Sequence, residues 1–198
     1  MKKEWLGKSY ILTIIDDFSR YCAAIPIRNK SDTTDTLKQA IKQLGKPQSI
    51  QADWGGEFRN NAMAQWYHNK GIKLKETVPH HSETNAVIER LNRSLQDMAR
   101  TAMIAAGMKG LWGDAIQWAA YTKNRIPHKT TGKAPIEALM TKPVNRNNLR
   151  PFGQHIMTHI YEDNREDKRW APRAQEARII GYTETYGVYQ AITPTGKL

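Results

Sequence analysis

The sequence QSIQADWGGEF, residues 48–58, decides the fold class. Its first five residues predict a short strand that ends directly before a carboxylate, Asp53. The glycine pair Gly55-Gly56 then forces a turn. In an open α/β sheet, functional groups gather at the carboxyl ends of strands. The stretch therefore predicts an α/β sheet with an acidic residue at the end of one strand.

Further strands and helices are predicted on both sides of this stretch. Pro26 suggests that the second strand lies at a sheet edge, because proline cannot donate a ladder hydrogen bond. Glycines mark helix ends at Gly45 and Gly71. The order of elements predicts a mixed α/β layer fold. In chain order we expect strands at 10–15 and 23–28, a helix from Ser31 or Asp32 to Gly45, the strand at 48–52, a helix at 61–69, a strand at 72–78, and helices at 85–106 and from Trp112 to before Pro127.

The longest predicted helix, residues 85–106, has two different faces. Apolar residues at three- and four-residue steps predict a stripe that packs on the core: Ile88, Leu91, Leu95, Met98 and Ala102. The opposite face carries one acid among bases and amides: Asn85, Glu89, Asn92, Arg93, Gln96 and Arg100. This polar face is either a solvated helix surface, with Glu89–Arg93 as an ordinary i,i+4 pair, or part of a binding site.

The composition of the sequence changes after residue 140. Residues 141–149 are polar and predict a linker. Short apolar segments follow at 156–161, 177–182 and 187–192, separated by charged or glycine-containing turns. They predict a small all-β module over 150–198, after a core domain over 1–140. Residues 162–173 are charged, and we expect them to be solvated.

The composition narrows the class of protein. The 198 residues include 30 Lys+Arg and 19 Asp+Glu, a net charge of +11, which suggests a polyanionic partner such as nucleic acid. One cysteine excludes a disulfide framework and a cysteine-rich zinc module. No apolar run is long enough for a membrane span, and no secretory signal is visible. We expect an intracellular protein with no membrane partner and no small-molecule cofactor.

Asp53 and Glu89 are the candidate metal ligands, with 35 residues between them. A carboxylate at a strand end and one on a helix over the same sheet edge can converge. Converging carboxylates bind Mg²⁺ or Mn²⁺ through oxygen, and such ions support phosphoryl transfer. Two carboxylates at this spacing also occur often by chance, so the residues alone leave a solvated helix face as the alternative.

A set of motifs resembles the integrase core of copia-type LTR retrotransposons, in the retroviral integrase superfamily. The motifs cover nearly the whole chain in the order found in the family. They are Gly7-Lys8-Ser9-Tyr10, Asp16-Asp17-Phe18-Ser19-Arg20-Tyr21, Asp53-Trp54-Gly55-Gly56-Glu57-Phe58, Gly71-Ile72, Pro79-His80, Asn85, Glu89-Arg90, Asn92-Arg93, Trp112, Asn124-Arg125, Pro135, Glu137, Leu149-Arg150, Phe152-Gly153 and Gly181-Tyr182.

The resemblance implies an RNase H-like core of mixed sheet and flanking helices, followed by an SH3-like β module. It also implies DDE chemistry, in which two Asp and one Glu hold two Mg²⁺ or Mn²⁺ ions while a DNA 3′-hydroxyl attacks a phosphodiester. Asp53 and Glu89 match the second and third carboxylates, both catalytic and metal-binding. The DNA contacts implied or proposed on this basis are Asn85, Arg90, Arg93, Arg100 and Trp54, the last as a base-stacking residue.

The sequence departs from the family pattern before residue 10. The family's first catalytic Asp lies on a strand before the one matching 10–15, and the only acid there is Glu4. Asp16 and Asp17 match a non-catalytic motif. We therefore expect the first strand and first metal ligand to be absent. Trp54 stands where the family has Asn, and Ala86 where it has Gly.

Three functions remain open on the sequence. The first is metal-dependent strand transfer of retrotransposon DNA into target double-stranded DNA, by a homo-oligomer acting in the nucleus. The second is a non-catalytic nucleic-acid-binding or oligomerising remnant of such an integrase, inactive because the first Asp is not found. The third is a ribonuclease H, which shares fold and metals, but the 85–93 helix motif and the β module argue against it.

Overall fold

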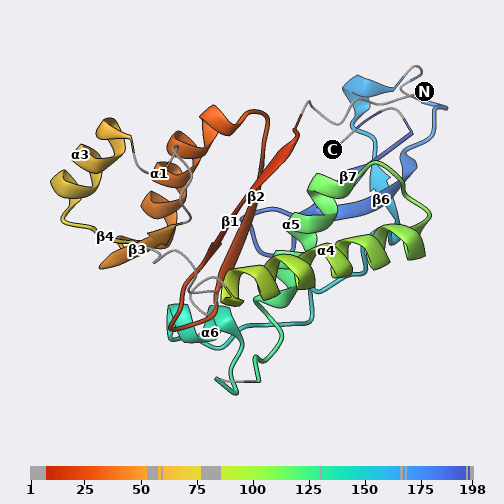
Figure 1. Ribbon diagram of the computed structural model, residues 1–198. Helices are drawn as coiled ribbons and strands as arrows, with labels where there is room; N and C mark the ends of the chain where they lie inside the picture. The colour runs from red at the N-terminus through yellow and green to blue at the C-terminus, as the bar shows by residue number, and fades with distance from the viewer. Residues whose placement is uncertain are drawn as a thin grey trace. The chain divides into compact units, whose positions relative to one another are not determined.

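A computed structural model describes residues 8–52, 58, 60–76, 86–129, 131–165, 167, 169–194 and 196 (Figure 1). The chain divides into two compact units. The first contains Met1–Ile15 and Ala23–Ser94, and the second contains Asp16–Cys22 and Leu95–Leu198.

The first unit contains two small sheets. Strands β1 (Tyr10–Ile15) and β2 (Cys22–Ile27) form one, and the hydrogen bond from Ser9 N–H to Ile27 O, 3.0 Å, extends their pairing. Strands β3 (Ser49–Ala52) and β4 (Lys73–Glu76) form the other and run parallel. Parallel and antiparallel pairing, which the expected mixed sheet combines, are therefore both present. In the described residues, however, no strand joins β1–β2 to β3–β4, so the single expected sheet is seen as two.

Helices α1 (Thr33–Leu44) and α3 (Asn61–Lys70) lie where the sequence predicts them. The side chain of Asn60 accepts the Met63 N–H at 2.9 Å and so caps the start of α3. Gly71 ends α3 in the left-handed region, with φ 61°. Helix α1 follows a 3₁₀ turn, η1 (Lys30–Asp32), and the Asp32 carboxylate accepts the Asn29 N–H at 3.0 Å rather than an N–H of α1. The expected side-chain cap of α1 is thus replaced by a cap of this turn.

The two sheets and two helices of the first unit share one hydrophobic core. Its buried members come from β1, α1, α3 and the segment that enters β4, namely Leu12, Leu37, Met63, Tyr67 and Ile72. Ile50 of β3 and Leu74 of β4 pack against it and remain partly exposed. Because they share this core, β1–β2 and β3–β4 pack together in one layered structure, although they form separate hydrogen-bonded sheets.

Helix α4 (Ala86–Ala106) is the longest helix in the described residues. Leu91, Leu95 and Ala99 are buried on one side, whereas Glu89, Arg93 and Arg100 are exposed. The apolar stripe expected from the sequence is confirmed at Leu91 and Leu95, and the expected polar face is confirmed at Glu89, Arg93 and Arg100. The helix ends before Gly107, which has a positive φ of 61°.

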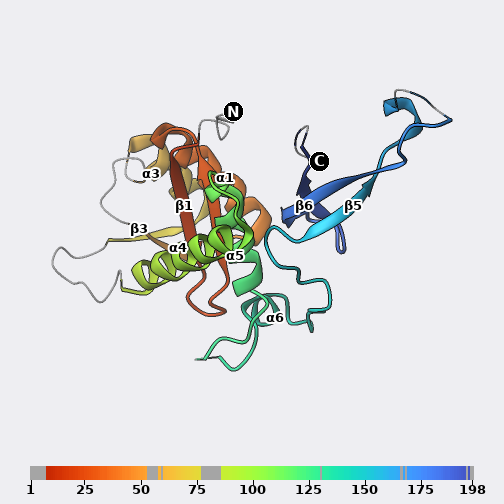
Figure 2. The same ribbon diagram turned by 90° about the vertical axis from the view of Figure 1, so that its right-hand side faces the viewer.

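The second unit combines helices with a three-stranded antiparallel sheet. Figure 2 shows the β5–β6 hairpin projecting beyond β7 as a two-stranded arm. Buried Ala177, Ile179, Ile180, Ala191 and Phe152 form the interior of this part. The elements are α5 (Trp112–Lys123), α6 (Pro135–Met140), β5 (His155–His159), the 3₁₀ turn η3 (Glu162–Asn164), β6 (Ala174–Tyr182) and β7 (Tyr189–Ile192), with strand order β5-β6-β7.

The β sheet of the second unit packs on α5 through aromatic side chains. The rings of Tyr121 on α5 and Tyr182 on β6 stack with centroids 3.8 Å apart and an interplanar angle of 9°. The guanidinium carbon of Arg125 lies 3.3 Å from the centre of the Tyr121 ring. The Trp118 indole N–H donates to the Arg150 carbonyl at 3.0 Å. These contacts join the β strands to α5 within the unit.

Asn124 ties the start of β2 to the end of α5, within the second unit. Its amide oxygen accepts the Cys22 N–H at 2.9 Å, and its amide nitrogen donates to the Cys22 carbonyl at 2.7 Å. Both residues are buried. The side chain therefore pairs with the backbone of Cys22 as a neighbouring strand would.

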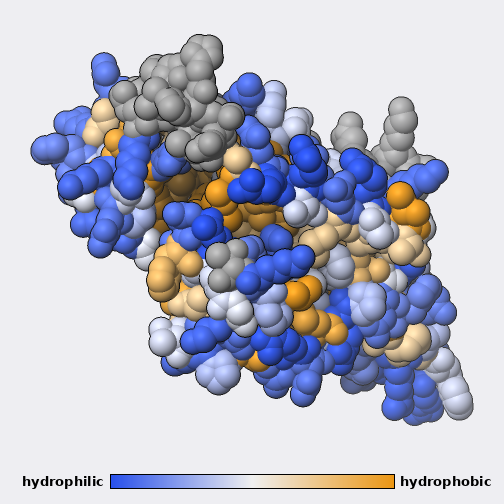
Figure 3. All heavy atoms as spheres, turned by 60° about the horizontal axis from the view of Figure 1, so that its bottom comes forward, coloured by the Kyte–Doolittle hydropathy of each residue, from blue (hydrophilic) through white to orange (hydrophobic). Residues whose placement is uncertain are grey.

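On the face drawn in Figure 3, hydrophilic residues predominate and apolar residues gather in restricted patches. Among the described residues, none of the helices has both the length and the apolar character needed to cross a membrane.

Candidate metal and nucleic-acid site

Only some residues of the predicted site lie in the part of the chain that the structure describes. Asp53, Trp54 and Asn85 lie outside the described residues. Strand β3 ends at Ala52, immediately before Asp53, and α4 begins at Ala86, immediately after Asn85. The convergence of Asp53 with Glu89 therefore stays a prediction.

Glu89 lies in the first turn of α4 and is exposed. No salt bridge or hydrogen bond joins its carboxylate to another residue of the described part of the chain. The i,i+4 pair with Arg93, which belongs to the alternative of a solvated helix face, is not among the ion pairs that the described residues form. A carboxylate in this position has its oxygens open to an external ligand, and carboxylate oxygens suit Mg²⁺ or Mn²⁺.

Three arginines proposed to contact DNA follow Glu89 along α4. Arg90 and Arg93 are exposed. Arg100 is also exposed and forms an ion pair with Asp97 at 3.0 Å, one turn earlier. Glu89, Arg93 and Arg100 recur at four- and seven-residue steps, so they share one face of the helix. Asp97 lies on the same face, so this face presents two acids and two cations to solvent.

Asp16 and Asp17, the other acids near a strand end, belong to a turn. The Asp16 carboxylate accepts the Ser19 N–H at 2.8 Å and the Ser19 hydroxyl at 2.5 Å, and Ser19 is fully buried. Asp17 pairs with Arg20 at 2.7 Å. Both carboxylates thus have partners within the β1–β2 turn, which agrees with the expectation that the motif is not catalytic.

No group of three or more His, Cys, Asp or Glu side chains that could hold a metal ion occurs among the described residues. Of the two predicted metal ligands, Asp53 and Glu89, only Glu89 is among the described residues. Its donor type fits a hard divalent cation. A complete site requires oxygens from outside the described residues, and Asp53 is the candidate.

Comparison with known families and proteins agrees with this arrangement. Residues 1–82 match the family described as "Integrase core domain". The Pol polyprotein of transposon TNT 1-94 from Nicotiana tabacum is 28% identical over 198 residues, or 96% of this chain. The Ty1-LR3 Gag-Pol polyprotein of Saccharomyces cerevisiae is 25% identical over 164 residues, or 79% of this chain. The chain spans 15% and 9% of the lengths of these two polyproteins.

Solved structures show a similar fold. The catalytic core domain of HTLV-2 integrase, solved with magnesium in a trimeric form, has a TM-score of 0.55 at 21% identity, over 65% of this chain and 82% of that one. The intasome of simian T-cell lymphotropic virus, in complex with the PP2A subunit B56 gamma, gives 0.58 at 15% identity, over 95% of this chain and 75% of that one.

The fold is similar to the RNase H-like fold of the retroviral integrase cores, and residues 1–82 match the integrase core domain family. The relatives along the sequence are Pol and Gag-Pol polyproteins of transposons, so this chain is similar to the integrase core of a retrotransposon. The resemblance found in the sequence is confirmed at this level.

The sequence did not predict the structural roles of two motif residues, Asn124 and Glu137. Asn124 pairs with Cys22, 102 positions away in the chain, which no local pattern signals. The Glu137 carboxylate accepts the N–H groups of Ala134 and Val144, both at 3.1 Å, and pairs with Arg146 at 3.0 Å. Proline followed two residues later by glutamate at a helix start was the available signal for Glu137 and for α6.

Proposed function

We propose that the chain is the catalytic core of a copia-type integrase and transfers a DNA 3′ end into double-stranded target DNA. The supporting observation is that the similarity to retrotransposon polyproteins covers 96% of the chain and includes the positions of Asp53 and Glu89. The openness of the Glu89 carboxylate on α4 is the structural feature that fits this role.

In this proposal Asp53 and Glu89 hold Mg²⁺ or Mn²⁺ through carboxylate oxygens. Such an ion lowers the pKa of a bound hydroxyl and stabilises a leaving oxygen in phosphoryl transfer. Arg90, Arg93 and Arg100 bind the phosphates of the duplex along α4 and fix its register. Asn85 borders the site, and Trp54 stacks on a base. The β strands of residues 150–198 form an SH3-like module.

Assembly and place of action follow from the reaction. Because two DNA ends must be joined to one target, we propose a homo-oligomer. We also propose that the protein acts inside the cell, in the nucleus when it acts on DNA.

A strand-transfer assay with Mg²⁺ and a labelled DNA end tests the proposal. We expect Glu89→Gln and Asp53→Asn to abolish product, because each removes a ligand charge. Asp97→Asn is the matched control, since it neutralises another exposed carboxylate on the same helix, and it should retain product. Turnover in Glu89→Gln equal to that of the control would overturn the assignment.

The second candidate is a DNA-binding remnant without catalysis. It is favoured by the net charge of +11, which suits binding to a polyanion such as DNA. Such a protein would bind DNA equally well with and without divalent metal. It would give no strand-transfer product, and neither Glu89→Gln nor Asp53→Asn would lower its affinity for DNA.

A further inference from the structure

A group of cations lies where three segments of the second unit meet: the β1–β2 turn, the end of α5 and the loop that follows α5. Asn124 joins the first two, because it pairs with both backbone groups of Cys22 at 2.9 and 2.7 Å. Its carbonyl accepts the Ile136 N–H at 3.0 Å, which holds the far end of the loop at the same point. The cations are Arg20 of the turn, Lys123 of α5 and His128 of the loop.

The three side chains lie close enough for their charges to act on one another. Burial lowers the pKa of the His128 imidazole, and the charges of Lys123 on α5 and Arg20 on the turn lower it further. Arg20 pairs with the Asp17 carboxylate at 2.7 Å, and Lys123 forms no ion pair with any described residue. The group therefore carries a surplus of positive charge.

The end of α5 does not account for this surplus. Cations near a helix C-terminus often serve its last carbonyl groups, which have no partner within the helix. In α5 the last four carbonyls, those of residues 120–123, already accept N–H donors at 3.0–3.3 Å from the backbone and from the Arg125 guanidinium. The charges of Lys123 and Arg20 are thus not needed as caps, and an anion from outside the chain suits them.

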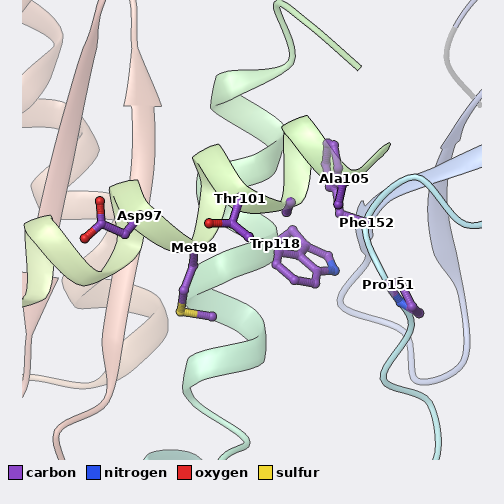
Figure 4. A pocket seen from close by; sticks show the side chains of 8 residues that line it. Asp97, Met98, Thr101, Ala105, Trp118, Pro151 and Phe152 are labelled. Carbon is purple, nitrogen blue, oxygen red and sulfur yellow. The ribbon is translucent and has the colours of Figure 1, made fainter. Parts of the chain in front are cut away.

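The segments that carry the cations are held in place before anything binds. Trp118 of α5 lines a cleft together with residues of α4 and of the segment that precedes β5 (Figure 4), and its indole N–H donates to the Arg150 carbonyl at 3.0 Å. Arg20 has a φ of 62°, which a residue with a side chain rarely adopts, and its N–H donates to the Asp16 carbonyl at 2.9 Å. Such a backbone persists where the surrounding structure fixes it, and it occurs most often at functional sites.

We propose that Arg20, Lys123 and His128 together bind one phosphate group, either of a nucleic-acid backbone or of a small phosphorylated molecule. The planar guanidinium of Arg20 matches two phosphate oxygens, and Lys123 adds a point charge with three donors. Protonated His128 supplies a further N–H donor. The proposal goes beyond strand transfer and does not depend on Asp53 or Glu89.

Titration with inorganic sulfate tests the site, because sulfate has the shape of phosphate and keeps its charge between about pH 5 and pH 8. The NMR signals of the histidine rings report binding at constant ionic strength. We expect the His128 signals to shift and saturate, and those of His68, an exposed histidine on α3, to stay unchanged. The bound anion should raise the pKa of His128, because it stabilises the protonated ring, so affinity should rise as the pH falls.

Lys123→Gln supplies the decisive variant, since it removes the charge and keeps most of the side chain. We expect it to weaken sulfate binding by about tenfold, the effect of losing one charge-assisted hydrogen bond. Lys142→Gln, at an exposed position of the same unit, removes the same charge and should bind like the wild type. Melting temperatures confirm that both variants are folded. A His128 shift that never saturates, or equal affinity in both variants, would overturn the proposal.

A short DNA duplex distinguishes the two sources of the phosphate group. If the site binds a nucleic-acid backbone, the duplex should displace sulfate from His128 and should bind less tightly to Lys123→Gln than to Lys142→Gln. If the duplex leaves the sulfate-bound His128 signals unchanged, the saturable sulfate site belongs to a small phosphorylated molecule. Either result supports a phosphate site, which the sulfate titration alone decides.

Discussion

Asn124 shows how one side chain replaces a stretch of backbone pairing. It is 2% exposed, and its amide satisfies both the N–H and the C=O of Cys22. Removing the amide leaves two buried backbone groups without partners, and each such group costs free energy. The burial that makes this contact important also raises the pKa of the Cys22 thiol to about 11, so the thiol stays protonated and unreactive near neutral pH.

We expect Asn124→Ala to lower the free energy of unfolding by about 2–4 kcal/mol, measured by urea denaturation. The control is Asn147→Ala, at an exposed position, which should change it by less than about 0.5 kcal/mol. Equal effects of the two substitutions would contradict the role given to Asn124.

Glu137 gives the fold a dependence on pH. The N–H groups of Val144 and Ala134 hold the pKa of its carboxyl below the ordinary value, with Arg146 adding to the effect. Because the folded-state pKa is the lower one, the stabilisation is present above the unfolded-state pKa. It is lost as the pH falls through the folded-state pKa, where the carboxyl is protonated in both states.

The measurement is the melting temperature of the wild type and of Glu137→Gln between about pH 7 and pH 3. The wild type should be the more stable above about pH 5, and the difference should shrink toward pH 3. A difference that is constant across this range would show that the carboxylate charge is not involved.

At the scale of elements, periodicity predicted helices well and sheet pairing poorly. Helix α4 was predictable because apolar residues at three- and four-residue steps, Leu91 and Leu95 among them, mark its buried side in the sequence itself. Helix α6 was missed because six residues are too few for a periodic pattern to emerge. The pairing of β3 with β4 joins residues 24 positions apart, such as Ser49 and Lys73, and only tertiary structure specifies it.

The candidate site was predictable to a similar extent. Spacing and motif located Glu89, and the helix places it on an exposed face. Neither spacing nor motif indicated the contacts between α5 and β6, because Tyr121 and Tyr182 stack across 61 positions of the chain and only tertiary structure brings them together. That stack joins β6 to α5 within the second unit.

We expect Tyr182→Ala to destabilise the protein by about 3–5 kcal/mol, because it removes a packed ring as well as its hydroxyl. Tyr182→Phe keeps the stack and loses only the hydroxyl bonds to the Arg150 N–H and C=O, at 2.8 and 3.0 Å, and should cost about 1–2 kcal/mol. Urea denaturation measures both. Tyr186→Ala, at an exposed tyrosine, is the control, and an effect as large as that of Tyr182→Ala would refute the stack's importance.

At the scale of the whole molecule, the net charge of +11 predicts DNA binding that weakens steeply with salt. Arg93→Ala and Arg100→Ala should each reduce the slope of log affinity against log salt by about 0.9, because each removes one phosphate contact. Fluorescence anisotropy with labelled duplex DNA measures the slope. Lys42→Ala, at an exposed position on α1, should leave it unchanged.

The central claim is that Asp53 and Glu89 hold a divalent cation for strand transfer, and titration with Mn²⁺ followed by electron paramagnetic resonance tests it most directly. We predict that the wild type and Asp97→Asn bind Mn²⁺ with the same affinity, and that Glu89→Gln and Asp53→Asn bind it at least about tenfold more weakly. Equal affinity in all four proteins would contradict the account, and the chain would then be a DNA-binding protein without the proposed metal site.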